Sequence, residues 1–230
     1  MDFIKRRRVY KYAKRAEAKR VGSKIIGVKW VDTNKGDRAR PNYRARLVAK
    51  EYRMEARPDL FAATPPLEYL RYLVSRCASS QLGSRPIKLM VQDVKKAYFY
   101  APATRNVYVE LPPERAQPGM CAKLHKSLYG TRDAALNWSQ AYTEVLVKMG
   151  FVKGKASPCC FFHKKWGIRT VVHGDDFVSV GSREATSLFQ KQLEAMFGIK
   201  TQVIGASQAV AHARAETGCR KSKDDGAAEN

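Results

Sequence analysis

The sequence predicts an α+β fold in which helices cover one face of an antiparallel sheet. Short runs of β-branched and aromatic residues alternate along the chain with longer segments of helical period. The order of these elements is β, α, β and then α, β, β, α, which suits an antiparallel sheet with helices packed against it. In addition, Gly174, Asp175 and Asp176 lie between two apolar runs of strand length, a pattern typical of a β-hairpin.

The order of the elements divides the chain into three regions. The first region, residues 1–22, is a basic N-terminal helix that spans residues 2–20 and is ended by Gly22-Ser23. Residues 23–205 hold the main fold, whose split arrangement is that of a ferredoxin-like or palm domain. Residues 206–230 have scarcely any large apolar side chain, so we expect a disordered polar tail there.

Local signals predict the elements of the main fold. Alternating or continuous apolar runs bounded by Gly, Pro and polar residues predict strands. These strands are expected at residues 24–31, 43–50, 87–93, 107–111 and 170–180, the last being the two arms of the hairpin. Apolar residues at helical spacing predict three helices. One follows Pro65-Pro66, one ends at Gly150, and one is capped by Ser182 and ends before Gly198.

The composition indicates a folded protein with a polyanionic partner. The 230 residues, of which 44% are hydrophobic, can hold one large or two small domains around a sizeable core. Lys and Arg number 43 against 21 acidic residues, a net charge of +22, and the excess is concentrated in residues 1–57. Nucleic acid is the leading partner, because each phosphate that Lys or Arg neutralises releases counterions. A basic structural protein would show the same bias, so charge alone assigns no function.

The cysteines and apolar segments indicate an intracellular protein. There are five cysteines, an odd number without C-x-x-C spacing, which argues against a disulfide framework or a zinc site. No apolar run approaches the roughly 20 residues of a membrane span, and the N-terminus lacks the apolar core of a signal peptide. We therefore expect a protein of the nucleus or of a cytoplasmic particle, not secreted and without a membrane partner.

Three carboxylates are candidate catalytic groups and metal ligands. Asp93 ends an apolar strand, whereas Asp175 and Asp176 occupy the tip of the hairpin, where Gly174 permits a bend. Neighbouring carboxylates repel one another unless a cation lies between them. Oxygen ligands from two strand ends make a Mg²⁺ site that leaves positions open for substrate phosphates. The alternative is a solvated acidic turn, and the second acidic strand end favours the metal site.

The expected strand at residues 43–50 offers a site for an anion. Arg44 and Arg46 fall on one face by the two-residue period, so both guanidinium groups could meet one triphosphate. Ordinary solvent-facing arginines on a half-exposed strand are an equal alternative.

Taken together, these segments resemble the reverse transcriptase domain of Ty1/copia-type retrotransposon polyproteins. The resemblance runs from about Lys24 to Gly205. Four segments carry it: RARLVAK at 44–50 looks like the fingers signature, QDVKKAY at 92–98 like the first catalytic motif, LYG at 128–130 like the template and nucleotide motif, and GDD at 174–176 like the second catalytic motif. Four motifs in this order are far more specific than any one of them.

The resemblance implies a polymerase palm with β-rich fingers and RNA-templated DNA synthesis, and we expect the thumb to be largely missing. Two Mg²⁺ ions, with Mn²⁺ as an alternative, would be held by Asp93 and Asp175, supported by Asp176. The implied partners are an RNA template, a DNA primer and deoxynucleoside triphosphates. Tyr98 would lie under the sugar and exclude a 2′-hydroxyl. The residues implied to meet the nucleotide are Lys35, Arg44, Arg46, Tyr98, Tyr129 and Gly130.

The chain departs from the family pattern at two places. His173-Gly174 stand where Tyr-Val is usual, which should loosen the turn and adds a titratable group. Asp133-Ala134-Ala135 stand where Gln-Ala-Pro is usual. We also find no thumb region and no ribonuclease H, integrase or protease segment, as in a fragment or degenerate copy. The alternative function is therefore a catalytically inactive retroelement remnant that keeps the fold and binds nucleic acid.

Overall fold

The computed structural model describes residues 2–52, 58–80 and 87–204 and divides the α+β chain into two units. Unit 1 comprises Met1–Thr64 and Val94–Lys153, and unit 2 comprises Pro65–Asp93 and Gly154–Asn230. Each unit therefore combines segments that are distant in the sequence. The tail predicted at 206–230 lies outside the described residues.

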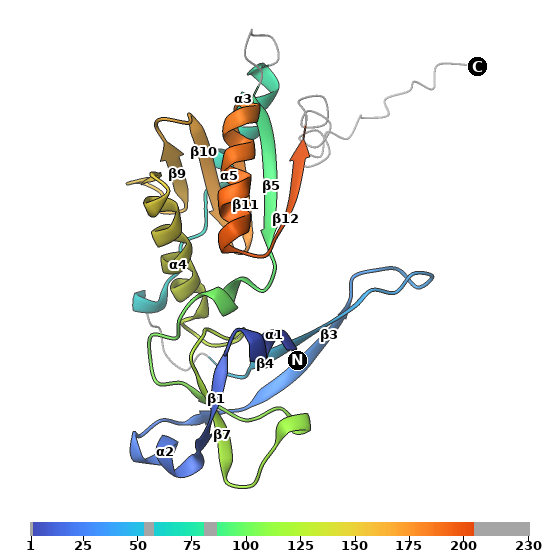
Figure 1. The fold of residues 1–230 in the computed structure, drawn as a ribbon, viewed down its shortest axis with the longest axis vertical. Helices are drawn as coiled ribbons and strands as arrows, with labels where there is room; N and C mark the ends of the chain where they lie inside the picture. Colours follow the sequence, from blue (N-terminus) through green and yellow to red (C-terminus); the bar gives the residue numbers. More distant parts are fainter. Residues whose placement is uncertain (1, 53–57, 81–86, 205–230) are drawn as a thin grey trace, which may run out of the picture. The chain divides into compact units, whose positions relative to one another are not determined.

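Unit 1 holds a four-stranded sheet and a separate hairpin (Figure 1). The sheet has the order β1-β7-β6-β2, in which β2 and β6 are parallel and the other pairs are antiparallel. Its strands are β1 (Tyr10–Lys14), β2 (Ile25–Ile26), β6 (Tyr108–Val109) and β7 (Met120–Leu124). The hairpin pairs β3 (Val28–Asn34) with β4 (Tyr43–Ala49), which confirms the predicted basic hairpin. The other elements of this unit are α1 (Asp2–Arg6), α2 (Arg15–Arg20), α4 (Ala134–Lys148), the short strand β8 (Val152–Lys153), and the 3-10 turns η1 (Pro58–Leu60), η3 (Ala97–Tyr100) and η4 (Pro113–Arg115).

The prediction of one basic helix near the N-terminus is wrong. The helical path stops at Arg8, whose φ of 48° lies in the left-handed region, and the chain continues as β1 before α2 begins. β1 is held by backbone pairing along its whole length with β7, more than a hundred residues away, and it buries Ala13. The lysines and arginines of this segment suit a solvated helix as well as an exposed strand. The pairing with β7 therefore decides that residues 10–14 form a strand.

Unit 2 contains a sheet with the strand order β12-β5-β11-β10-β9. Its described strands are β5 (Lys88–Val94), β9 (Cys160–His163), β10 (Ile168–His173), β11 (Asp176–Gly181) and β12 (Ile199–Ile204). The pairs β5–β11, β11–β10 and β10–β9 are antiparallel. The predicted acidic strand and the Gly-Asp-Asp hairpin are therefore confirmed, whereas β12 was not predicted.

Helices cover both faces of this sheet, so the prediction of helices on one face is wrong. On one face, Leu73 of α3 (Leu67–Ser79) packs in a core with Leu89, Val171 and Val180. The opposite face carries α5 (Arg183–Met196), which lies over β11 in Figure 1. Gly181 lies at the end of β11. A Cβ added to it would project to that second face and lie 3.5 Å from the methyl carbon of Thr186 in α5. Both faces of the central strands are apolar, and each needs a cover.

The three predicted helices are confirmed as α3, α4 and α5. Trp138, Tyr142 and Leu146 form the buried side of α4. The Ser182 hydroxyl accepts a hydrogen bond from the backbone N–H of Ala185 at 3.2 Å, which caps α5 as expected. Among the described residues, no helix combines the length and the apolar character needed to cross a bilayer.

Candidate active site

Asp93 and Asp176 face one another across two strands of unit 2. The antiparallel pairing of β5 with β11 places Asp93 directly opposite Asp176. Directly opposed residues project to the same face, with Cβ atoms about 4.5–5.5 Å apart. Asp175 lies in the adjoining turn, where Gly174 adopts a φ of 63°. The carboxylates of two distant motifs are thus brought to one place within one unit.

Negative charge is concentrated at this point. Burial raises the pKa of the Asp176 carboxyl above its ordinary value, and the nearby charges of Asp175 and Asp93 raise it further. His173, which is the partner of Asp176 across the β10–β11 ladder, acts in the opposite direction. Opposed like charges destabilise a sheet, so this arrangement costs stability and is characteristic of a functional site.

The chemistry of these groups suits a divalent cation that is completed by substrate. Carboxylate oxygens are the ligands Mg²⁺ prefers, and a cation would relieve the repulsion that raises the pKa of Asp176. Within residues 2–52, 58–80 and 87–204, no three His, Cys, Asp or Glu side chains are placed to hold a metal by themselves. Mg²⁺ usually takes only one or two carboxylates and fills its remaining positions with water and phosphate oxygens. Asp93, Asp175 and Asp176 therefore fit as anchors rather than as a complete cage.

In unit 1, the predicted cations of the hairpin share one face. Arg44 lies opposite Thr33 and Arg46 opposite Val31, and both arginines are exposed. The backbone N–H of Lys35 donates to Asn42 at 2.8 Å, which continues this register and gives Lys35 the same face as Thr33. Lys29, opposite Val48, is a fourth exposed cation of that face and was missed from the sequence. The two-residue period counted back from Lys35 would have found it.

The predicted Tyr129-Gly130 segment lies against the end of the same hairpin. The backbone N–H of Ala49 donates to the Tyr129 carbonyl at 2.7 Å. A Cβ added to Gly130, whose φ is 83°, would lie 2.1 Å from the Ala49 carbonyl oxygen. Tyr98 packs on Tyr129, with 4.6 Å between the ring centroids. Four of the predicted nucleotide residues are hence tied, through β4, to one part of unit 1: Arg44, Arg46, Tyr129 and Gly130.

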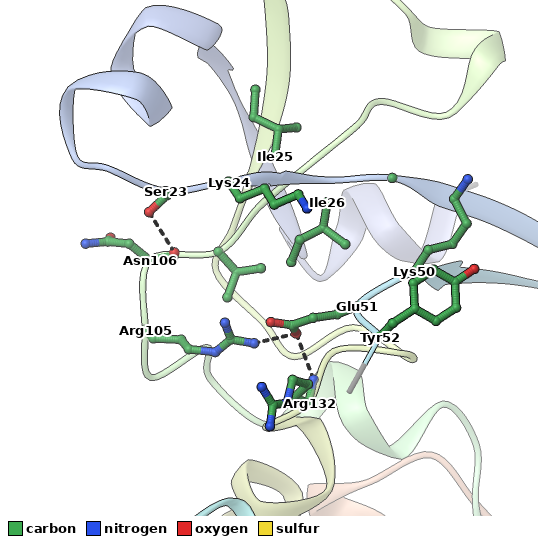
Figure 2. A pocket seen from close by; sticks show the side chains of 12 residues that line it. Ser23, Lys24, Ile25, Ile26, Lys50, Glu51, Tyr52, Arg105, Asn106 and Arg132 are labelled. Carbon is green, nitrogen blue, oxygen red and sulfur yellow. Dashed lines mark hydrogen bonds and ion pairs between the residues drawn. The ribbon is translucent and has the colours of Figure 1, made fainter. Parts of the chain in front are cut away.

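A partly exposed ion-pair network that the sequence did not reveal holds the chain beyond Gly130. One nitrogen of the Arg105 guanidinium lies 2.6 Å from Glu51, which also accepts from the backbone N–H of Arg132 at 2.8 Å (Figure 2). The same nitrogen lies 3.0 Å from Asp133. Burial alone would raise the pKa of Asp133, but Arg105 and a hydrogen bond from Asn137 hold it below its ordinary value. The network joins the end of β4 to the start of α4.

The chain is similar to reverse transcriptases of transposons. The model of the family "Reverse transcriptase (RNA-dependent DNA polymerase)" matches residues 11–208. The chain is 28% identical to the "Retrovirus-related Pol polyprotein from transposon RE1" of Arabidopsis thaliana over 69% of its own length and 11% of the relative's. It is 28% identical to the corresponding polyprotein of transposon TNT 1-94 of Nicotiana tabacum, over 70% of the chain and 12% of the relative. A "Truncated transposon Ty1-A Gag-Pol polyprotein" of Saccharomyces cerevisiae is 29% identical over 45% of the chain and 8% of that protein. The chain thus spans about a tenth of the curated relatives it matches.

Replacing Asp93 by Asn is expected to stabilise the fold. Removing one of the opposed charges should raise the free energy of unfolding by about 0.2–1 kcal/mol at neutral pH, a small gain because solvent screens these groups. A carboxyl with a raised folded-state pKa destabilises the fold when ionised, so the advantage should shrink as the pH falls through the pKa of Asp176. Urea denaturation at several pH values measures both effects. Glu144→Gln, on the exposed side of α4, is the matched control, and a less stable Asp93→Asn protein contradicts the expectation.

Replacing Gly130 by Ala is expected to cost more than an equal change at Gly119. Both residues have positive φ, but a Cβ at Gly119 would meet nothing within 4 Å, whereas at Gly130 it would meet backbone. Backbone strain alone costs about 1 kcal/mol, and the displacement of Ala49 adds to it. Thermal and urea unfolding of the two variants gives the difference. Equal losses would show that Gly130 is needed only for its φ.

Replacing Arg105 by Met should destabilise unit 1 by about 1–3 kcal/mol, because Glu51 and buried Asp133 lose their cation. The control is Arg15→Met, which breaks the exposed pair with Glu110 and should cost at most about 1 kcal/mol.

The lowered pKa of Asp133 predicts how the stability that this carboxylate contributes changes with pH. The stabilisation by ionised Asp133 should be complete at a pH above the ordinary Asp pKa of about 3.9. It should disappear as the pH falls through the lowered pKa of Asp133 in the folded protein. An acid titration of the wild type against Asp133→Asn checks this, and a constant difference would refute it.

Proposed function

The chain belongs to the reverse transcriptase (RNA-dependent DNA polymerase) family, and we propose that it acts as the RNA-directed DNA polymerase domain of a copia-type retrotransposon polyprotein. Its reaction would add deoxynucleotides from their triphosphates to the 3′-hydroxyl of a primer paired with an RNA template. The observation that carries this proposal is the register of β5 with β11, which sets Asp93 opposite Asp176, the residue that follows Asp175 in the chain.

The three aspartates would serve as the metal-binding groups of this reaction. Asp93 and Asp175 would bind two Mg²⁺ ions, or Mn²⁺ in their place, and Asp176 would support them. When bound, these ions would activate the primer hydroxyl and offset the charge of the triphosphate and of the pyrophosphate that leaves. The exposure of Asp175 and Asp176 leaves room for substrate oxygens to complete the coordination. The sheet of unit 2 would then be the palm.

The hairpin of unit 1 would bind the triphosphate as part of the fingers. Lys35, Arg44 and Arg46 present their charges on one exposed face, and a guanidinium group forms paired hydrogen bonds with phosphate oxygens. Lys29 extends the same face and would add a fourth cation. The contact of Tyr98 with Tyr129 would form a firm support for the sugar, with Gly130 allowing close approach of the backbone.

A second candidate function is nucleic-acid binding without nucleotide incorporation. The observation that favours it is the exposed basic face of the hairpin, which can bind a phosphate backbone without a metal. The replacement of the usual Tyr-Val by His173-Gly174 at the hairpin points the same way, because a looser turn would position Asp175 less firmly. The basic face of the hairpin would then be the functional part of the protein.

Primer extension on an RNA template separates the two functions. The wild type should incorporate deoxynucleotides in Mg²⁺, lose this activity in a chelator, and regain it when Mg²⁺ or Mn²⁺ is restored. Asp93→Asn and Asp175→Asn should each lower incorporation by at least about a hundredfold, because removing a ligand costs more than removing its supporting partners. Binding of the primer-template should persist in both variants. Glu144→Gln, far from the three aspartates in sequence and exposed on α4, should retain the activity.

The result of this experiment decides between the proposals. If the wild type binds primer-template but incorporates nothing in either metal, the protein is a nucleic-acid-binding member of its family and the polymerase proposal fails.

A further inference from the structure

Unit 1 contains a cavity that the proposed reaction does not use. Its volume is about 390 Å³, within the usual range of roughly 300–1,000 Å³ for small-ligand sites. Four segments line it: residues 23–27, 50–52 and 105–107, together with Arg132 (Figure 2). It is formed by the chain before β3, the chain after β4 and the Arg105 network.

The charge of the cavity selects an anion. Lys24, Lys50, Arg105 and Arg132 contribute cations to its lining, whereas Glu51 is the one acidic residue among the described lining residues. The carboxylate of Glu51 is already engaged by the Arg105 guanidinium at 2.6 Å and by the backbone N–H of Arg132 at 2.8 Å. Its charge is therefore offset within the protein, and the field of the exposed lysines acts on whatever enters.

The remaining walls suit a flat aromatic group. Ile26 gives an apolar lining, whereas its neighbour Ile25 packs in a different cluster on the other face of β2. Tyr52 is 73% exposed and lies beside Lys50 at one side of the cavity (Figure 2). A large exposed aromatic ring next to a cation is a common platform for an unpaired base, because every base has a face that can stack.

We propose that this cavity binds one nucleotide unit of a single-stranded nucleic acid, with the base against Tyr52 and Ile26 and the adjoining phosphates at Lys24 and Lys50. A cavity of this size takes one base with its sugar, and the base must be unstacked to enter, which excludes a paired strand. The inference rests on the proposed function in one respect, since that function supplies an unpaired RNA strand as template. The site itself requires neither metal nor catalysis.

Binding of a short fluorescein-labelled oligouridylate to the full chain, measured by anisotropy in a chelating buffer, tests the site. Tyr52→Ala should weaken binding by roughly tenfold. Lys24→Gln combined with Lys50→Gln should weaken it and lower the slope of log affinity against log salt by about 0.7 for each lost phosphate contact. All three side chains are exposed, so these variants should fold normally, which a thermal unfolding curve verifies.

Matched controls separate the cavity from general charge and aromatic effects. Lys148→Gln with Lys153→Gln removes two exposed charges elsewhere in unit 1, and Tyr72→Ala removes an exposed ring of α3. Both should bind the strand like the wild type. A loss in these controls equal to that in the cavity variants would overturn the proposal.

Two competitors define the ligand. A fully paired duplex of the same length should bind the wild type and Tyr52→Ala equally, and a loss confined to the single strand supports the site. Uridine monophosphate should not displace the strand at a concentration comparable to that of the oligouridylate. If it does, the cavity is a site for free nucleotides and the proposal is overturned. Because the assay contains no metal, a failed primer-extension experiment with intact Tyr52-dependent binding would refute the polymerase function alone.

Discussion

The register between β5 and β11 is the constraint on which the candidate site depends. It sets Leu89 opposite Val180 and, four residues further along β5, Asp93 opposite Asp176. A slip of one residue would turn Asp93 to the other face and remove Leu89 from the core it shares with α3. Apolar packing at one end of the ladder thus offsets the repulsion at the other. The like charges stay together because the rest of the pair has only one well-packed register.

Local signals predicted those parts of the fold that neighbouring residues decide. Gly174 with its two apolar flanks predicted the β10–β11 hairpin, and the Ser182 cap predicted the start of α5. The errors arise where a distant segment decides. Residues 10–14 are a strand because β7 pairs with them, and β12 has weak apolar alternation but joins the edge of the sheet beside β5. The placement of α3 and α5 on opposite faces depends on which side each connection crosses, which periodicity does not encode.

The candidate site likewise contains residues that local sequence predicts and residues that only distant contacts reveal. Asp93, Asp175 and Asp176 could be proposed from the sequence because a second acidic strand end favours a shared metal site over a solvated acidic turn. The shared face of Arg44 and Arg46 follows from the period of two, and the observed register extends that face to Lys29. The Arg105 network escaped detection because its members are more than twenty-five residues apart and none belongs to a recognisable motif. Such a pairing leaves no local pattern, and only the packed structure reveals it.

The network also explains how the chain accommodates an acidic residue at position 133. A carboxylate there would be costly, because the residue is only 3% exposed, if it lacked partners. One oxygen accepts from Arg105 at 3.0 Å and the other from the side-chain amide of Asn137 at 3.2 Å, one turn into α4. The negative charge also stands at the N-terminus of that helix, where the helix dipole favours it. Asp133 is therefore coupled to Arg105: the acid is tolerated because the cation is present, and the pair keeps the segment after Gly130 anchored to the end of β4.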